Sequence, residues 1–233
     1  MTHPGSAQIW AVFGASGTGK GAWLKQQLRK LKPAKLLIWD ANADAVPEDP
    51  AYEYGEFAQR VPDHHALERG IKAARFRLRY VPQRDKKKRD AEFAFFCAKA
   101  WDAGPGTVVV VEELSQVTQA SSAPENWKRL TNAGRHRGMH VIGVSQFPAQ
   151  VDKSLMGNAT LIHTGHLPNK AHRQAVAVEM DCDPEVIRAL ADLDFVEWRR
   201  GVPEIAHGRV TFAAPRRPRA SSSSSGSAVS PKA

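Results

Sequence analysis

The chain has 233 residues, of which 42 % are hydrophobic and 24 % are charged, values that exclude a wholly disordered protein. Its 33 basic and 24 acidic side chains give a formal net charge of +9, and this excess favours a polyanionic partner, nucleic acid before an anionic membrane. Two cysteines exclude a disulfide framework and indicate a reducing compartment, and we expect neither a signal peptide nor an integral membrane segment.

Apolar runs and helical periodicity alternate along the chain. The first half is predicted to form strand 8–13, helix 21–30, strand 36–39, helix 63–74, strand 76–81 and helix 90–102. The second half is predicted to form strand 107–111, helix 124–133, strand 139–144 and strand 159–164. Strands that alternate with helices predict an α/β fold, a mainly parallel sheet flanked by helices on both faces.

The net positive charge is concentrated in two places. Residues 60–89 carry eleven basic and three acidic side chains, a net charge of +8. We predict a folded domain over residues 1–213 and a disordered, basic and serine-rich tail over residues 214–233, because the tail has no aromatic residue to bury.

A basic run within residues 60–89 is the candidate surface for DNA. Its members are Arg84, Lys86, Lys87, Lys88 and Arg89. Lysine and arginine bind duplex DNA through its phosphates without discriminating sequence, and the run has no aromatic side chain on which single-stranded bases could stack. The alternative is a solvated helix start with no ligand.

The strongest motif is Gly14-Ala-Ser-Gly-Thr-Gly-Lys20, which has the GxxxxGK spacing of a nucleotide P-loop between a predicted strand and a predicted helix. Its glycines allow backbone N–H groups to converge on phosphate oxygens, and the lysine brings a positive charge to the β- and γ-phosphates. The predicted nucleotide-binding residues are Gly14, Ala15, Ser16, Gly17, Thr18, Gly19, Lys20, Gly21 and Ala22.

One position departs from the P-loop pattern. The residue after the lysine is ordinarily serine or threonine, whose hydroxyl binds Mg²⁺, and here it is Gly21. We expect Thr18 or Ser16 to supply this hydroxyl, or a water molecule to replace it.

Two acids follow the four valines of the strand at 107–111. In P-loop ATPases such a strand is expected beside the P-loop strand, with its first acid holding Mg²⁺ directly or through water and its second polarising the attacking water. Glu112 and Glu113 fit these roles in that order, the alternative being two surface acids at a strand end.

The region from Arg135 to Pro148 carries a family resemblance. An arginine lies three residues before Gly138, the strand at 139–144 follows, and the strand closes with Ser145-Gln-Phe-Pro148. With the P-loop and the paired acids, this pattern resembles the FtsK/HerA superfamily of ring-forming DNA pumps. The resemblance implies that Gln146 senses the γ-phosphate and that Arg135 is a catalytic finger for the neighbouring subunit, with Arg137 as the alternative.

Within that superfamily the chain is most similar to the DNA-packaging ATPases of tailless, membrane-containing phages and related prophages. This resemblance implies a RecA-like P-loop fold, ATP and Mg²⁺ as cofactors, double-stranded DNA as the substrate that is moved, and a homo-oligomeric ring, expected to be a hexamer. It further implies a capsid vertex or portal protein as a docking partner, and a location in the cytoplasm of a bacterial host or in the virion at the packaging vertex.

Other functions remain open at this point. One is a morphogenesis or secretion ATPase like those of filamentous phages, the zonula occludens toxin-like group, although that group usually carries a membrane helix. Another is a nucleotide-gated DNA-binding scaffold in which Gly21 marks lost hydrolysis. A small-molecule kinase is disfavoured, because its acceptor is not water and it would not need Glu113.

Overall fold

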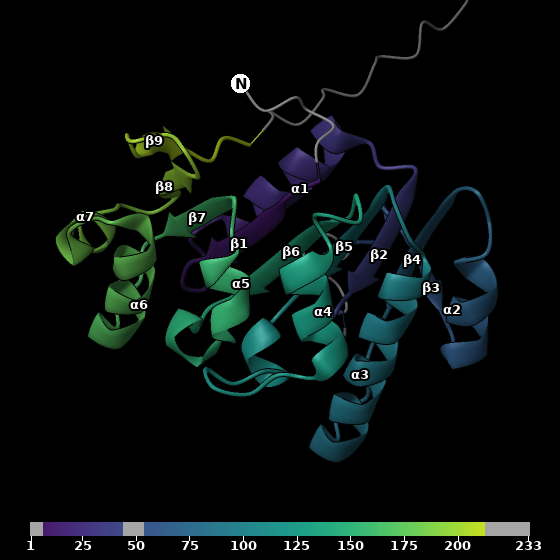
Figure 1. Cartoon of the computed structure of the whole chain (residues 1–233). Helices are drawn as coiled ribbons and strands as arrows, with labels where there is room; N and C mark the ends of the chain where they lie inside the picture. The colour runs from purple at the N-terminus through teal and green to yellow at the C-terminus, as the bar shows by residue number, and fades with distance from the viewer. Residues whose placement is uncertain (1–6, 44–53, 213–233) are drawn as a thin grey trace, which may run out of the picture.

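The computed structural model describes residues 7–43 and 54–212. These residues form a nine-stranded sheet in the order β3-β4-β2-β5-β6-β1-β7-β8-β9, in which β1 to β7 pair in parallel and β8 and β9 are antiparallel additions at one edge (Figure 1). The predicted α/β class and mainly parallel sheet are therefore confirmed.

The strands are β1 (Ile9–Phe13), β2 (Lys35–Trp39), β3 (Gln59–Val61), β4 (Phe76–Tyr80), β5 (Thr107–Val111), β6 (His140–Ser145), β7 (Leu161–Gly165), β8 (Asp194–Arg199) and β9 (Ala206–Arg209). The helices are α1 (Lys20–Leu31), α2 (His64–Gly70), α3 (Lys86–Asp102), α4 (Glu125–Ala133), α5 (Lys153–Gly157), α6 (Lys170–Met180) and α7 (Pro184–Arg188), with short 3₁₀ turns η1 (Leu114–Gln116) and η2 (Pro148–Gln150).

The two faces of the sheet are covered unequally. One face packs against α2 to α7 through a large aromatic and aliphatic core, and the other packs against α1 and the segment 54–58. The central strand β5 is buried along its whole length, which suits four consecutive β-branched valines. Helix α1 buries Trp23, Leu24 and Leu28 on one side. It ends at Leu31, and the capping residue Lys32 has a left-handed φ of 44° and is followed by Pro33.

The order of the central strands corrects one expectation. We expected β5, which precedes the paired acids, to lie beside the P-loop strand β1, but β6 lies between them and pairs with both. The acids therefore face the P-loop across the end of β6. Because parallel strands end at one edge of the sheet, the segments that follow β1, β5 and β6 meet at this carboxyl edge.

The C-terminal third contains elements that the sequence patterns did not predict. Helices α6 and α7 cover the end of one face, and β8 and β9 extend the sheet beyond β7 (Figure 1). The short strand β3 was also missed, and the predicted helix 63–74 ends early, at Gly70. Among the helices of the described ranges, none combines the length and the apolar character that crossing a bilayer requires.

The charged regions lie as follows. The basic run occupies the start of α3, where Asp85 caps the helix by accepting the backbone N–H of Lys88, which explains an acid inside a basic run. In β4, Arg77 is exposed whereas Arg79 is buried and donates to Asp40 (3.1 Å), so this strand does not present a continuous basic face. The tail predicted to be disordered lies outside the described residues.

Candidate active site

The P-loop lies between β1 and α1, as its motif predicts. Gly17 and Gly19 have φ values of 80° and 88°, a conformation that costs glycine least. The helix that begins at Lys20 directs its first N–H groups at the loop, which is the arrangement that binds phosphate.

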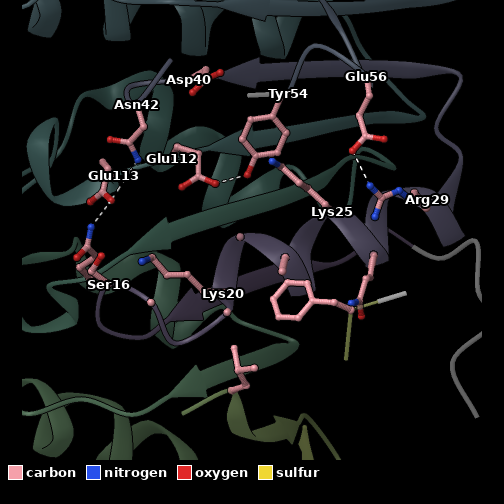
Figure 2. Close-up of a pocket in the computed structure, with 18 of the residues that line it drawn as sticks. Ser16, Lys20, Lys25, Arg29, Asp40, Asn42, Tyr54, Glu56, Glu112 and Glu113 are labelled. Carbon is pink, nitrogen blue, oxygen red and sulfur yellow. Dashed lines mark hydrogen bonds and ion pairs between the residues drawn. The ribbon is translucent and has the colours of Figure 1, made fainter. Parts of the chain in front are cut away.

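A pocket of about 1070 Å³ opens over the P-loop and runs along α1 (Figure 2). Six of the nine predicted nucleotide-binding residues line this pocket: Ser16, Gly17, Gly19, Lys20, Gly21 and Ala22. The other three, Gly14, Ala15 and Thr18, do not line it. Glu112, Glu113 and Gln146 line the same pocket. The structure thus brings together the phosphate loop, the paired acids and the glutamine from three separate stretches of sequence.

Glu113 is held in place by two amide side chains. Gln146 Nε2 donates to Glu113 Oε1 (2.7 Å) from the end of β6, and Asn42 Nδ2 donates to the same oxygen (3.3 Å) from beyond the end of β2. Glu113 has a left-handed backbone with φ of 47° and is buried, a strained conformation that is typical of functional positions. These contacts orient one carboxylate oxygen and leave the other available to a ligand in the pocket.

Glu112 lies deeper than Glu113 and contacts a residue that the motifs did not predict. Its Oε1 accepts a hydrogen bond from the hydroxyl of buried Tyr54, as Figure 2 shows. Burial, together with the neighbouring Glu113 charge, raises the pKa of Glu112 to about 7, although the Tyr54 hydrogen bond and Lys20 oppose this shift. A cation beside Glu112 would favour its charged form.

Lys20 faces the two acids across the pocket. Its Nζ donates to the carbonyl of Ala15 (3.4 Å). Burial lowers the pKa of Lys20, while the charges of Glu113 and Glu112 act to raise it. One half-buried ammonium and two buried carboxylates in this pocket provide charges of both signs for a phosphate and its counterion.

The donor set suits Mg²⁺, which prefers carboxylate and other oxygen ligands. Glu112 offers a buried carboxylate, and Ser16 offers an exposed hydroxyl on the P-loop side. We also expected that Thr18 could supply this hydroxyl, and the structure corrects that expectation. The Thr18 hydroxyl donates to the carbonyl of Ala15 (2.9 Å) within the loop, and Thr18 does not line the pocket. A Cβ on Gly21 would meet no heavy atom within 4 Å, so the missing hydroxyl is not excluded by lack of space.

The two candidate finger arginines lie at the opposite edge of the sheet. They precede β6, whereas the pocket lies beyond its far end. Arg135 is exposed and its side chain makes no hydrogen bond or ion pair with the described part of the chain. The guanidinium of Arg137, in contrast, lies 4.4 Å from the ring centre of Trp101, which also binds Arg129 at 4.0 Å.

The candidate DNA residues divide into two groups. Arg84, Lys86, Lys87 and Lys88 are exposed, and Lys86 pairs with Asp90 (2.6 Å). Arg89 is half-buried and donates to the carbonyl of Gln116 (3.5 Å) in the turn that follows Glu113. The basic run therefore contacts the turn that follows the paired acids.

Sequence patterns missed Asn42 and Tyr54. Asn42 lies three residues beyond the end of β2, and a polar side chain shortly after a predicted parallel strand is a signal that could have pointed to the site. Tyr54 is in an irregular segment and carries no such signal.

This architecture, with a P-loop on β1, paired acids after β5 and a glutamine after the strand between them, is the RecA-like P-loop NTPase fold. No family model matches the sequence.

The comparisons with known proteins find a phage protein by sequence and a viral packaging NTPase and a conjugative coupling protein by fold. Over 183 residues the chain is 27 % identical to Protein P9 of Pseudoalteromonas phage PM2, a match that covers 78 % of this chain and 79 % of the relative. The genome packaging NTPase B204 from Sulfolobus turreted icosahedral virus 2, solved with AMPPCP, superposes with a TM-score of 0.72 at 15 % identity and covers 91 % of this chain and 100 % of its own. The bacterial conjugative coupling protein TrwB superposes with a TM-score of 0.60 at 10 % identity and covers 91 % of this chain and 87 % of its own. The predicted resemblance to viral packaging ATPases is thereby confirmed.

Proposed function

We propose that this chain is an ATP-driven motor that moves double-stranded DNA into a viral capsid. The observation that carries the proposal is the bond between Gln146 and Glu113 inside the pocket of the P-loop. A strand-end glutamine bonded to a buried glutamate can respond to the γ-phosphate and change the position of that glutamate. A chain that only binds nucleotide would not need this arrangement.

Each pocket residue then has a distinct task. The P-loop and Lys20 bind the β- and γ-phosphates. Glu113 orients the attacking water and accepts its proton, with one carboxylate oxygen held by Gln146 and Asn42. Glu112 holds Mg²⁺, directly or through water, and the metal when bound offsets the charge of the phosphates. Tyr54 positions Glu112 through its hydroxyl.

The position of Arg135 supports a ring. A strand rises about 3.3 Å per residue, so the six residues of β6 separate Arg135 from its own pocket by about 20 Å. Arg135 can therefore act on a nucleotide only in another subunit. A homo-oligomeric ring, expected to be a hexamer, places one subunit's arginine at the next subunit's pocket and leaves a channel for DNA.

DNA as the moved substrate is supported by charge and by the relatives. Four exposed basic side chains gather at the start of α3, and backbone contacts of this kind bind any sequence. B204 is a genome packaging NTPase and TrwB a conjugative coupling protein. The proposal includes docking at a capsid vertex or portal protein, in the cytoplasm of a bacterial host.

The test is ATP hydrolysis measured with and without linear double-stranded DNA. We expect DNA to stimulate hydrolysis, and we expect Glu113→Gln to reduce it by about 10²- to 10⁴-fold while nucleotide still binds, because the amide cannot accept the water's proton. A double variant, Lys87→Ala with Lys88→Ala, should keep the basal rate and lose part of the stimulation. Nucleotide binding without hydrolysis under every DNA condition would contradict the motor and favour the nucleotide-gated scaffold.

A further inference from the structure

The pocket is longer than the phosphates of a nucleotide require. One end of the pocket, where the paired acids lie, is lined by Lys20, Glu113 and Gln146. In the proposed function the γ-phosphate lies at this end. A nucleotide oriented in this way must extend its base away from the acids. The base would therefore occupy the part of the pocket that lies on the other side of β1.

Leu193, Thr211 and Phe212 line the pocket on that other side. Leu193 directly precedes β8 and Phe212 follows β9 by three residues. In the sheet, β8 and β9 lie beyond β7 on one side of β1, whereas β5 and its acids lie on the opposite side. The two ends of the pocket are therefore built by opposite halves of the sheet.

This C-terminal wall is fixed against the P-loop and α1. A Cβ on Gly19 would come within 3.1 Å of both Leu193 and Val210, so these side chains pack directly on the loop. The backbone N–H of Val210 donates to the carbonyl of Leu193 (2.8 Å). Gln26 Nε2, on α1, donates to the carbonyl of Thr211 (2.7 Å). The residue after Thr211 is thus anchored beside the helix that binds the phosphates.

Phe212 is a large apolar side chain that lines the pocket with 66 % of its surface exposed. An exposed aromatic ring gains free energy when another flat apolar surface covers it. The chemical group that a nucleotide would bring to this end of the pocket is its base, which is flat and aromatic.

We propose that Phe212 and Leu193 form the base-binding platform of this pocket, with the nucleobase stacked on the Phe212 ring. The inference rests on the proposed function, since it requires a nucleoside triphosphate as ligand. Stacking uses the flat face that every base has, and it is tolerant of base identity. The platform therefore takes nucleoside triphosphates as a class, and purines, with the larger face, bind more tightly than pyrimidines.

The test compares two ligands on the full chain: AMPPCP, which has a base, and inorganic tripolyphosphate, which has none. Phe212→Ala should weaken AMPPCP binding by about 5- to 100-fold, the range for loss of one base–aromatic stack, and leave tripolyphosphate binding unchanged. Phe212→Trp keeps a flat aromatic ring at this position and should bind AMPPCP as tightly as the wild-type chain. Val178→Ala shortens an exposed apolar side chain on α6, outside the pocket, and should change neither affinity.

Four results would overturn the platform. Equal weakening of both ligands would mean that Phe212 only supports the P-loop. No change in AMPPCP binding would mean that the base lies elsewhere. A wild-type chain that binds tripolyphosphate and AMPPCP equally would have no base site, and one that binds neither would overturn the proposed function and the platform together.

Discussion

The two edges of the parallel sheet differ in how their charged side chains are partnered. At the carboxyl edge, Glu113 is bonded to Gln146 and Glu112 to Tyr54, and Lys20 lies among them in one pocket. At the amino edge, Arg137 is stacked on Trp101, and Arg135 extends into solvent. The first edge is assembled within one chain. The second presents a cation with no anionic partner among residues 7–43 and 54–212, as the proposed ring of identical subunits requires.

Removing Arg135 should have the largest effect. Loss of a finger arginine costs about 10³- to 10⁵-fold in turnover, and we expect Arg135→Ala to reduce ATP hydrolysis by at least about 10³-fold. Because the arginine would act across subunits, mixing Arg135→Ala chains with Glu113→Gln chains should restore part of the activity, measured as ATP hydrolysis against the mixing ratio. A mixture as inactive as its parents would contradict action across subunits.

The matched control at the same edge is Arg137→Ala. Its guanidinium already contacts Trp101, so its removal should lower stability more than turnover. A larger loss of turnover for Arg137→Ala than for Arg135→Ala would identify Arg137, and not Arg135, as the catalytic finger.

The second prediction concerns acid stability at the amino edge. His140, at the start of β6, is buried beside Trp10 (4.3 Å between ring centres), and burial lowers the pKa of His140 to about 4. An unfolded chain has the ordinary histidine pKa near 6.5, so between about pH 6.5 and pH 4 the unfolded chain binds the proton and the folded chain does not. The free energy of unfolding should therefore fall as pH decreases through this window, and His140 should contribute about 2 kcal/mol to the loss between pH 7.5 and pH 5.

Urea unfolding at pH 7.5 and pH 5 measures this contribution. His140→Gln cannot take up the proton, so the variant should lose less stability on acidification than the wild-type chain. Equal losses in the two proteins would show that His140 is protonated in the folded state.

The smallest effect is expected at the carboxyl edge. Gly21→Ser places a hydroxyl at the position where P-loops ordinarily bind Mg²⁺, in space that is open in this structure. We expect the Mg²⁺ concentration that half-saturates nucleotide binding to fall by about 5-fold, near 1 kcal/mol, in calorimetric titrations. Gly157→Ser, at the end of α5 and equally unobstructed, is the matched control and should leave Mg²⁺ dependence unchanged.

Several features were determined by local sequence. The strand, loop and helix around Gly14 to Lys20 follow from an apolar run, glycines that adopt positive φ, and helical spacing after them. The strand before Glu112 follows from four valines. These patterns depend on neighbours in the chain, so they could be predicted without a fold.

Strand order, and with it the contacts of the acids, was decided by tertiary structure. Nothing local places β6 between β1 and β5, and that insertion is what brings Gln146 to Glu113. Asn42 reaches the same carboxylate across 71 positions of sequence, and Tyr54 reaches Glu112 across 58.

The sequence alone therefore determined which chemical groups this protein has: a phosphate loop, two acids, a glutamine and an arginine before the strand that carries the glutamine. Only the folded chain decided which of them meet. Parallel strands bring their carboxyl ends to one edge, whatever their distance in sequence, so Glu113 and Gln146 lie in one pocket with Lys20. The same geometry holds Arg135 at the opposite edge, because it precedes its strand instead of following it.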